Sequence, residues 1–196
     1  MTLRAALLLV SLGAQFFAKA DVAMAGSSQD IAAARAQAKV QRIERNAKLA
    51  HPDRAPTEFT EDEINAYFAA GKVQLPAGVQ SVTFQGAPGI VTASCRVDFD
   101  KVTAGRRSAN PLLSLFSGIH EVVVVANARG AGGQGAVEVQ SVSIDGVEVP
   151  RFILELFVEK FLQPRYPNVG LDSRFPLPQK IDTAVVGVRE LTVIQK

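Results

Sequence analysis

The sequence predicts an α+β fold, in which one curved antiparallel sheet packs around a long apolar helix and a further helix lies near the N-terminus. Runs of alternating apolar and polar residues, which are typical of half-buried antiparallel strands, fill much of the chain. A strongly apolar segment between Pro150 and Pro164 comes late in the chain. Because strands dominate and one apolar helix follows most of them, the pattern indicates α+β architecture.

Residues 1–25 have the pattern of a secretory signal peptide. Arg4 supplies a positive charge, an apolar run extends to Ala18, and small-residue cleavage motifs end at Ala20 and Ala25. The apolar run is shorter than the roughly 20 residues that a membrane span needs. The single cysteine, Cys95, lies far from the cleavage region, which excludes a lipid-modified N-terminal cysteine. We therefore expect cleavage of this segment and export to the periplasm.

Composition excludes several classes of function. The net charge of +2, the absence of tryptophan and the presence of only two tyrosines argue against nucleic-acid or carbohydrate binding on an aromatic platform. One cysteine cannot form an intramolecular disulfide, and Cys95 lies in a strand pattern, as a small buried apolar residue would.

Residues 26–56 are expected to form a basic helix and a linker ahead of a single domain at residues 57–196. Ser28 is the expected N-cap, and Ile31, Val40 and Ile43 give the helix only a thin apolar face. We expect a solvated or loosely docked helix, and a helix on a membrane surface is the alternative. The proline-rich stretch at 51–56 has the composition of a linker.

A second helix begins at a capping box formed by Thr60 and Glu63. Phe59 before the cap and Ile64 after it form a hydrophobic staple, and Gly71 ends the helix. The spacing then changes to the period of two that strands have. Strands are expected at 79–84, 91–99, 121–129, 137–144, 183–188 and 190–194, with a hairpin turn at Asp145-Gly146.

The segment from Pro150 to Gln163 is expected to be the long apolar helix. Arg151, Glu155 and Glu159 form one narrow polar stripe, so more than one side of the helix must be covered. The cover is either more protein or a bound apolar ligand. For the second case, the residues expected to line an apolar groove are Phe152, Leu156, Phe157 and Phe161.

Residues 105–119 are expected to form a short amphipathic helix between two strands. Leu112, Leu115, Phe116 and Ile119 follow helical spacing, and the basic pair Arg106 and Arg107 precedes them. One interpretation is a lid or membrane contact, formed by these two arginines with Leu112, Leu115 and Phe116. The other is a short helix that closes the open end of the sheet.

The sequence contains no set of residues typical of catalysis. It lacks a nucleophile elbow and zinc-ligand spacing, and its glycine-rich stretch at 130–135 lacks the lysine of a phosphate-binding loop. His120 beside Glu121 and the carboxylates of Asp98 and Asp100 are interpreted as ordinary surface groups. We expect no catalytic residue, metal or cofactor.

Short motifs give the chain a family resemblance over residues 57–196. They are the helix start Thr60–Asn65, the strand segments 91–99 and 136–144, the pairs Leu177-Pro178 and Ile181-Asp182, and the final strands at 185–188 and 191–194. In these the chain resembles exported bacterial domains of the tubular lipid-binding (TULIP-like, BPI-like) and AsmA-like superfamilies. The resemblance implies a strongly curved sheet wrapped on a long helix, with an apolar groove for acyl chains. A single domain is short for a full lipid tube, so the groove is expected to be small or completed by a partner.

These observations lead to two functional hypotheses. The first is a periplasmic, non-enzymatic binding protein for a lipid or another apolar ligand, which acts in envelope lipid handling and makes transient contact with the membrane surface. The second is a structural or protein-interaction module of an envelope assembly, without a small-molecule ligand.

Overall fold

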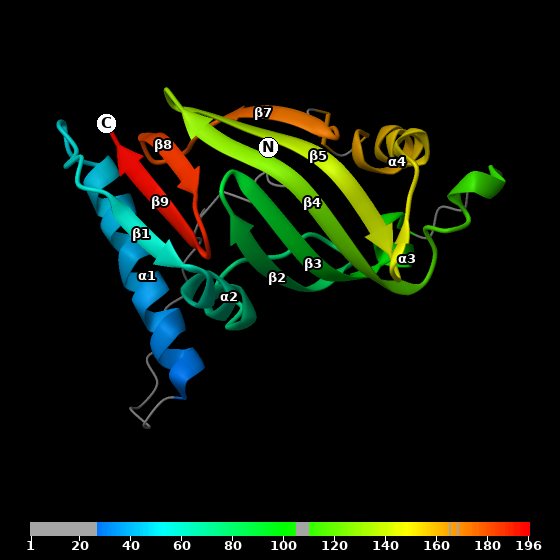
Figure 1. Ribbon diagram of the computed structural model, residues 1–196, viewed down its shortest axis with the longest axis horizontal. Coiled ribbons are helices and arrows are strands. Elements are labelled where there is room, and N and C mark those ends of the chain that lie inside the picture. The colour runs from blue at the N-terminus through cyan, green and yellow to red at the C-terminus, as the bar shows by residue number, and fades with distance from the viewer. Residues whose placement is uncertain (1–26, 105–109, 165, 168) are drawn as a thin grey trace.

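The computed structural model describes residues 27–104, 110–164, 166–167 and 169–196. The predicted signal peptide, Arg106 and Arg107 lie outside these residues. The described part is α+β with one large antiparallel sheet, as predicted. Figure 1 shows α1 (Ser28–Ala47) and the terminal strands β1 (Thr57–Thr60) and β9 (Glu190–Gln195) at one end of the sheet and α4 (Arg151–Phe157) at the other.

Both N-terminal helices begin at capping boxes. Helix α1 (Ser28–Ala47) is capped by Ser27, one residue before the predicted cap, with Asp30 as its partner. Helix α2 (Glu61–Ala69) follows the short strand β1 (Thr57–Thr60), and its predicted box of Thr60 and Glu63 is confirmed. The Thr60 hydroxyl accepts the Glu63 N–H at 3.2 Å, and the Glu63 carboxylate accepts the Thr60 N–H at 3.0 Å.

Helix α1 is docked more firmly than its composition predicts. Its buried residues include Ala36 and Val40, each only 1% exposed. The packed face therefore includes alanine, which the predicted apolar face of Ile31, Val40 and Ile43 left out. A side chain as small as that of alanine lets a helix approach its neighbour closely. The Gln195 side chain also donates to the carbonyl of Ile43 at 2.9 Å.

The larger part of the sheet is a set of antiparallel neighbours, β2 to β5 in chain order. Short strands β6 and β7 both pair with β5, and neither was predicted. The bounds are β2 Val79–Ala87, β3 Ile90–Asp98, β4 Ile119–Ala131, β5 Gln134–Ile144, β6 Val147–Glu148 and β7 Asp172–Pro176. Strand β7 ends at a proline, which the ladder tolerates in a strand with only one described neighbour.

The remaining strands, β8 (Ile181–Val186), β9 (Glu190–Gln195) and β1, pair antiparallel in the order β8-β9-β1. Strand β8 joins β4 through one registered pair, Gly130 with Ala184. A Cβ atom on residue 130 would lie 2.9 Å from the Cβ of Ala184, so this close approach requires glycine.

The long apolar helix is not present in the predicted form. The segment is helical, but α4 (Arg151–Phe157) has only 7 residues and continues as a π-helical turn, η3 (Val158–Leu162). The longest described helix is α1, with 20 residues. In the second half of the segment, i→i+5 hydrogen bonds such as that from the Gln163 N–H to the Val158 carbonyl at 2.8 Å replace the α-helical ones. The helical segment ends at Leu162, shortly before Pro164, since proline lacks an N–H and disfavours helical geometry in the residue before it.

The predicted helix over 105–119 is wrong for its described part. Residues 110–119 contain only the 3₁₀ helix η2 (Pro111–Leu113), and β4 already begins at Ile119. Gly118 has a φ of 79°, a conformation that ends any helical course. Strand β3 also ends earlier than predicted, because Asp98 caps the short helix α3 (Phe99–Val102).

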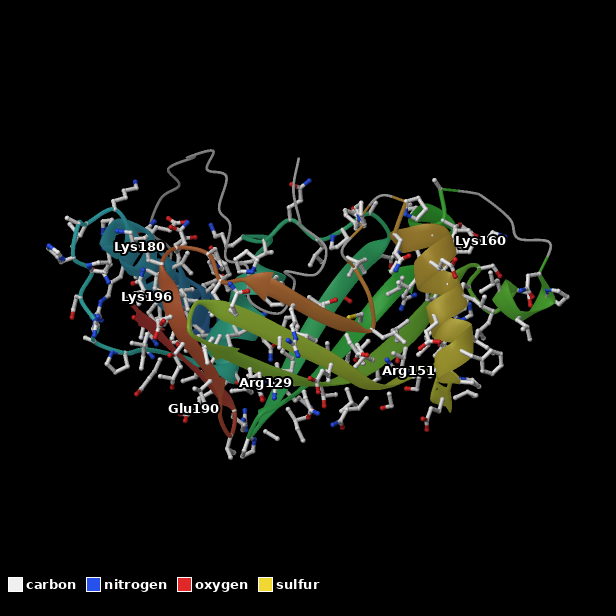
Figure 2. The ribbon with its side chains drawn as sticks, turned by 90° about the horizontal axis from the view of Figure 1, so that it is seen from above. Arg129, Arg151, Lys160, Lys180, Glu190 and Lys196 are labelled. Atoms are coloured by element: carbon white, nitrogen blue, oxygen red, sulfur yellow. The ribbon has the colours of Figure 1, made fainter. Side chains whose placement is uncertain are left out.

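Two hydrophobic clusters lie along the sheet. The α1 core comprises Ala36, Val40, Ile43, Phe59, Tyr67, Val82, Phe84, Val91, Ala126, Ala128, Val137, Phe175, Leu177, Ile181, Ala184 and Val193. The α4 core comprises Val97, Phe99, Leu113, Phe116, Val122, Val142, Ile144, Val149, Leu154, Phe157 and Phe161. In Figure 2 the labelled Lys180 and Lys196 lie at the α1 end, and Arg151 and Lys160 lie on the helix at the α4 end.

Candidate functional site

An apolar cavity of about 100 Å³ lies in the α1 core. Its walls come from α1, α2, β1, β8, β9 and the ends of β2 and β3 that meet at their hairpin. The apolar lining residues are Val40, Ile43, Phe59, Ile64, Phe68, Phe84, Val91, Pro178, Ile181, Val186, Leu191 and Val193. The cavity therefore brings together segments from both ends of the described chain.

Local sequence patterns place several of these side chains. Phe59 and Ile64, the two residues of the predicted staple, both line the cavity. On β9, Leu191 and Val193 point to the same face because alternate residues of a strand do so. The pattern of each segment could be recognised in the sequence, but the meeting of the segments could not.

Polar groups at the cavity also hold the scaffold together. The Glu61 carboxylate accepts the backbone N–H of Gly86 at 3.0 Å and lies 3.3 Å from the Arg189 guanidinium. Glu44, Gln85, Gln179 and Glu190 complete the polar lining. Tyr67 belongs to the α1 core without lining the cavity, and its pKa is raised first by burial of the phenol and then by the Glu44 carboxylate. The cavity thus combines an apolar interior with carboxylates and amides.

The four residues predicted to form a groove do not line this cavity. Phe157 and Phe161 are buried in the α4 core, Leu156 is half-buried, and Phe152 is 55% exposed. The Phe157 ring stacks on Phe116 with centroids 4.1 Å apart and contacts Phe99 and Phe161 edgewise or tilted. The rings around Phe157 are those of the protein itself. A ligand at these four positions stays a prediction.

The predicted lid residues point in different directions. Leu112 and Leu115 are exposed, whereas Phe116 is buried together with Leu113. Leu113 and Phe116 lie three residues apart in a turn in which the Phe116 N–H donates to the Leu113 carbonyl at 3.2 Å, and such a turn places both side chains on one side. The amphipathic face expected from α-helical spacing is therefore not formed.

His120 makes a polar site that sequence reasoning missed. Its Nδ1 lies 2.6 Å from Oδ2 of Asp145, and its Nε2 lies 2.6 Å from the carbonyl oxygen of Ser117. The hydrogen bond to Asp145, then the Ser117 carbonyl, raise the pKa of His120; the same bond from His120 lowers the pKa of Asp145. Asp145 follows His120 by 25 residues, so no local spacing could reveal the pair.

The other carboxylates and the thiol have structural roles. Asp98 caps α3 and pairs with Lys101 at 3.1 Å, and that hydrogen-bonded partner lowers the pKa of Asp98. Within the described residues, no group of three or more His, Cys, Asp and Glu side chains is placed to hold a metal ion. Burial raises the pKa of Cys95 to about 11, as expected for an inert thiol.

Comparison of the chain with models of protein families, with curated proteins and with solved structures gave no match. Among the described helices, none combines the length and the apolar character that a membrane crossing requires.

Proposed function

We propose that this protein is a non-enzymatic binding protein that holds an apolar group, such as an acyl chain, in the cavity of the α1 core. The observation that carries the proposal is the cavity itself, which has twelve apolar lining residues contributed by helices and strands far apart in the sequence. Sites for small apolar ligands have this character, with a mainly apolar lining and a few polar groups.

The volume of the cavity limits the ligand. Pockets that enclose a drug-sized molecule measure roughly 300–1,000 Å³. A cavity of about 100 Å³ suits one short apolar segment rather than a whole lipid. The remainder of the ligand would lie outside, beside Glu44, Glu190 or the loop at Gln179. This accords with the expectation that a groove in so short a domain is small or completed by a partner.

Export and a role in envelope lipid handling belong to the same proposal. They rest on the signal-peptide pattern of residues 1–25 and on the resemblance to tubular lipid-binding domains. The strongly curved sheet that this resemblance implies is likewise part of the proposal. So is transient contact with the membrane surface, through which a carrier would collect its ligand.

Two tryptophan substitutions distinguish the observed cavity from the predicted groove at α4. Leu191→Trp fills the cavity, and Leu156→Trp places the same bulk on half-buried Leu156 at the other end. Binding of a fluorescent fatty-acid probe to the purified protein without residues 1–25 gives the affinity, and a thermal melt reports folding. We expect Leu191→Trp to weaken binding at least about tenfold, since overpacking excludes the ligand.

Each outcome has a definite meaning. Loss of binding in Leu156→Trp alone would move the ligand to Phe152, Leu156, Phe157 and Phe161. Equal binding in both variants and in the unchanged protein would contradict both sites. No uptake of acyl probes by the unchanged protein would contradict the proposal as a whole.

A second function is favoured by a different observation. Several large apolar residues at the α4 end are substantially exposed: Leu112, Leu115, Ile119, Val147 and Phe152. Exposed apolar side chains that gather on one end of a molecule suit contact with another protein. The alternative is therefore an interaction module of an envelope assembly, and crosslinking through residue 152 in cells would test it.

A further inference from the structure

Both ring nitrogens of His120 face hydrogen-bond acceptors. The partner of Nδ1 is a carboxylate oxygen, and the partner of Nε2 is a backbone carbonyl oxygen, each at 2.6 Å. A neutral imidazole carries one N–H and therefore satisfies only one of these acceptors. The imidazolium carries two and satisfies both. The geometry thus fits the protonated side chain.

These two contacts join segments that are distant in the sequence. Ser117 belongs to the segment between η2 and β4, whereas Asp145 lies in the turn between β5 and β6. The turn is held independently, because Asp145 Oδ1 accepts the Glu121 N–H at 3.0 Å and the Asp145 N–H donates to the Glu121 carbonyl at 2.8 Å. The imidazole adds the link from this fixed turn to the segment that contains Ser117.

That segment covers the aromatic centre of the α4 core. Phe116 directly precedes Ser117, and its ring stacks on Phe157 and meets Phe99 with centroids 5.4 Å apart. The His120 ring itself lies 6.1 Å from the Phe99 ring. Movement of Ser117 would therefore carry Phe116 away from its aromatic neighbours.

We propose that His120 is a pH-sensitive latch, which when protonated holds the segment Pro111–Ser117 against the β5–β6 turn and when neutral releases it, while the Gly118 carbonyl keeps its hydrogen bond from the Phe99 N–H. When the imidazole loses its second proton, the hydrogen bond that is lost is the one to the Ser117 carbonyl. A neutral imidazole keeps the proton on Nδ1, facing the negative charge of Asp145, and its Nε2 lone pair then faces the Ser117 carbonyl oxygen. The released segment is free to expose Phe116 and the rings beneath it.

The charges around the imidazole support protonation. Asp145 faces it from the β5–β6 turn, and the Ser117 carbonyl faces it from the preceding segment. Strand β3 presents Val97 opposite His120, and α3 presents the Phe99 ring, so neither element adds a charge there. Among the charged residues on these elements, Asp98 and Lys101 pair with each other, Arg96 lies opposite Glu121, and Asp100 follows Phe99 on α3.

The direction of the pH dependence follows from the raised pKa of His120. A group whose pKa is higher in the folded state stabilises that state below its unfolded pKa of about 6.5. The contribution is lost as the pH rises through the folded pKa. The latch is therefore closed in mild acid and open in mild alkali. It is independent of the proposed apolar cavity, which lies in the α1 core, so either idea can fail alone.

Hydrogen–deuterium exchange of the folded protein, corrected for the intrinsic effect of pH, measures the latch directly. At about pH 5 and about pH 9 the protection of residues 111–117 is compared with that of β4. We expect protection of the segment to fall about fivefold or more at the higher pH, and protection of β4 to stay constant. The midpoint should coincide with the NMR titration of the His120 ring.

Three variants make the test specific. His120→Gln should abolish the pH dependence. Asp145→Asn should move the midpoint to lower pH, and asparagine suits the positive φ of 49° at this position. His51→Gln removes the chain's other histidine, which lies away from the latch, and should leave the dependence unchanged. Unchanged pH dependence in His120→Gln, or constant protection of the segment in the unmodified protein, would overturn the proposal.

Discussion

The side-chain amide of Asn65 makes the two backbone hydrogen bonds that a neighbouring strand would otherwise make with Phe84. Its Oδ1 accepts the Phe84 N–H at 2.7 Å, and its Nδ2 donates to the Phe84 carbonyl at 2.9 Å. Glu61, one helical turn earlier, accepts the Gly86 N–H in the same way. Strand β2 pairs only with β3 among the described strands, so these two side chains of α2 cover groups that an edge strand leaves open.

Asn65→Asp tests this use of the amide. Aspartate keeps the size and the acceptor but loses the donor, and its charge then faces the Phe84 carbonyl. We expect the free energy of unfolding to fall by about 1–3 kcal/mol in urea denaturation, because one half-buried acceptor is left unsatisfied. Gln80→Glu, at an exposed position of the same strand, makes the same change in charge and should cost much less. Similar losses in the two variants would show that charge alone is responsible.

At the scale of single residues, the sequence predicts interactions whose partners are close along the chain. The Thr60–Glu63 capping box was predictable because both residues belong to one turn. The pair of His120 and Asp145 was not, because the fold alone brings the start of β4 beside the β5–β6 turn. The Asp145-Gly146 turn itself was predicted correctly from its dipeptide.

For helix α1 as well, the sequence predicts one property and misses another. Its existence followed from its composition and cap, but its buried face did not. Ala33 and Ala36 contribute little apolar surface in a sequence profile, yet both are buried. Strand β7 was missed for a related reason, because its proline and polar residues are tolerated only where β5 offers it a ladder. In both cases the structure of the element depends on a segment that is distant in the sequence and packs or pairs with it.

A matched pair of substitutions measures how firmly α1 is docked. Ala36→Asp places a charge on the buried face, and Ala34→Asp places the same residue on the exposed face. We expect Ala36→Asp to lower the free energy of unfolding by about 3 kcal/mol or more, because the charge is buried without a partner. Ala34→Asp should cost about 1 kcal/mol or less, which is the difference in helix propensity. Equal effects in chemical denaturation would contradict the docking.

The apolar residues around 112–116 failed to form the predicted helix for an identifiable reason. Their spacing suited an α-helix, but Pro111 at the first turn and Gly118 at positive φ leave room only for the 3₁₀ turn η2. Periodicity alone does not distinguish these two helix types in so short a segment. The four predicted groove residues lie in a helical segment, as expected, but two of them, Phe157 and Phe161, pack among aromatic rings of the protein.

Across the whole molecule, two cores share one sheet. Cys95 and Val139 are half-buried and pack against both the α1 core and the α4 core. Strands β3, β4 and β5 pair in continuous antiparallel ladders. We therefore expect the two ends to unfold together rather than as separate units.

The thiol of Cys95 reports on this junction. Its pKa of about 11, raised by burial, leaves little thiolate at neutral pH. We expect its reaction with a disulfide reagent at about pH 8 to be at least ~100-fold slower in the folded protein than in denaturant. Gradual acceleration well before the main unfolding transition, as followed by circular dichroism, would indicate that the two cores open separately.

The pairing of β1 with β9 governs the order in which the molecule can be completed. The Gln195 side chain bonds to the Ile43 carbonyl across a sequence separation of 152 residues. During synthesis, the buried face of α1 and the walls of the cavity must therefore wait until nearly all of the described chain has emerged. Closing such long loops is slow, whereas the hairpins from β2 to β5 depend on nearby partners. The cavity is thus the last part of the molecule to acquire its shape.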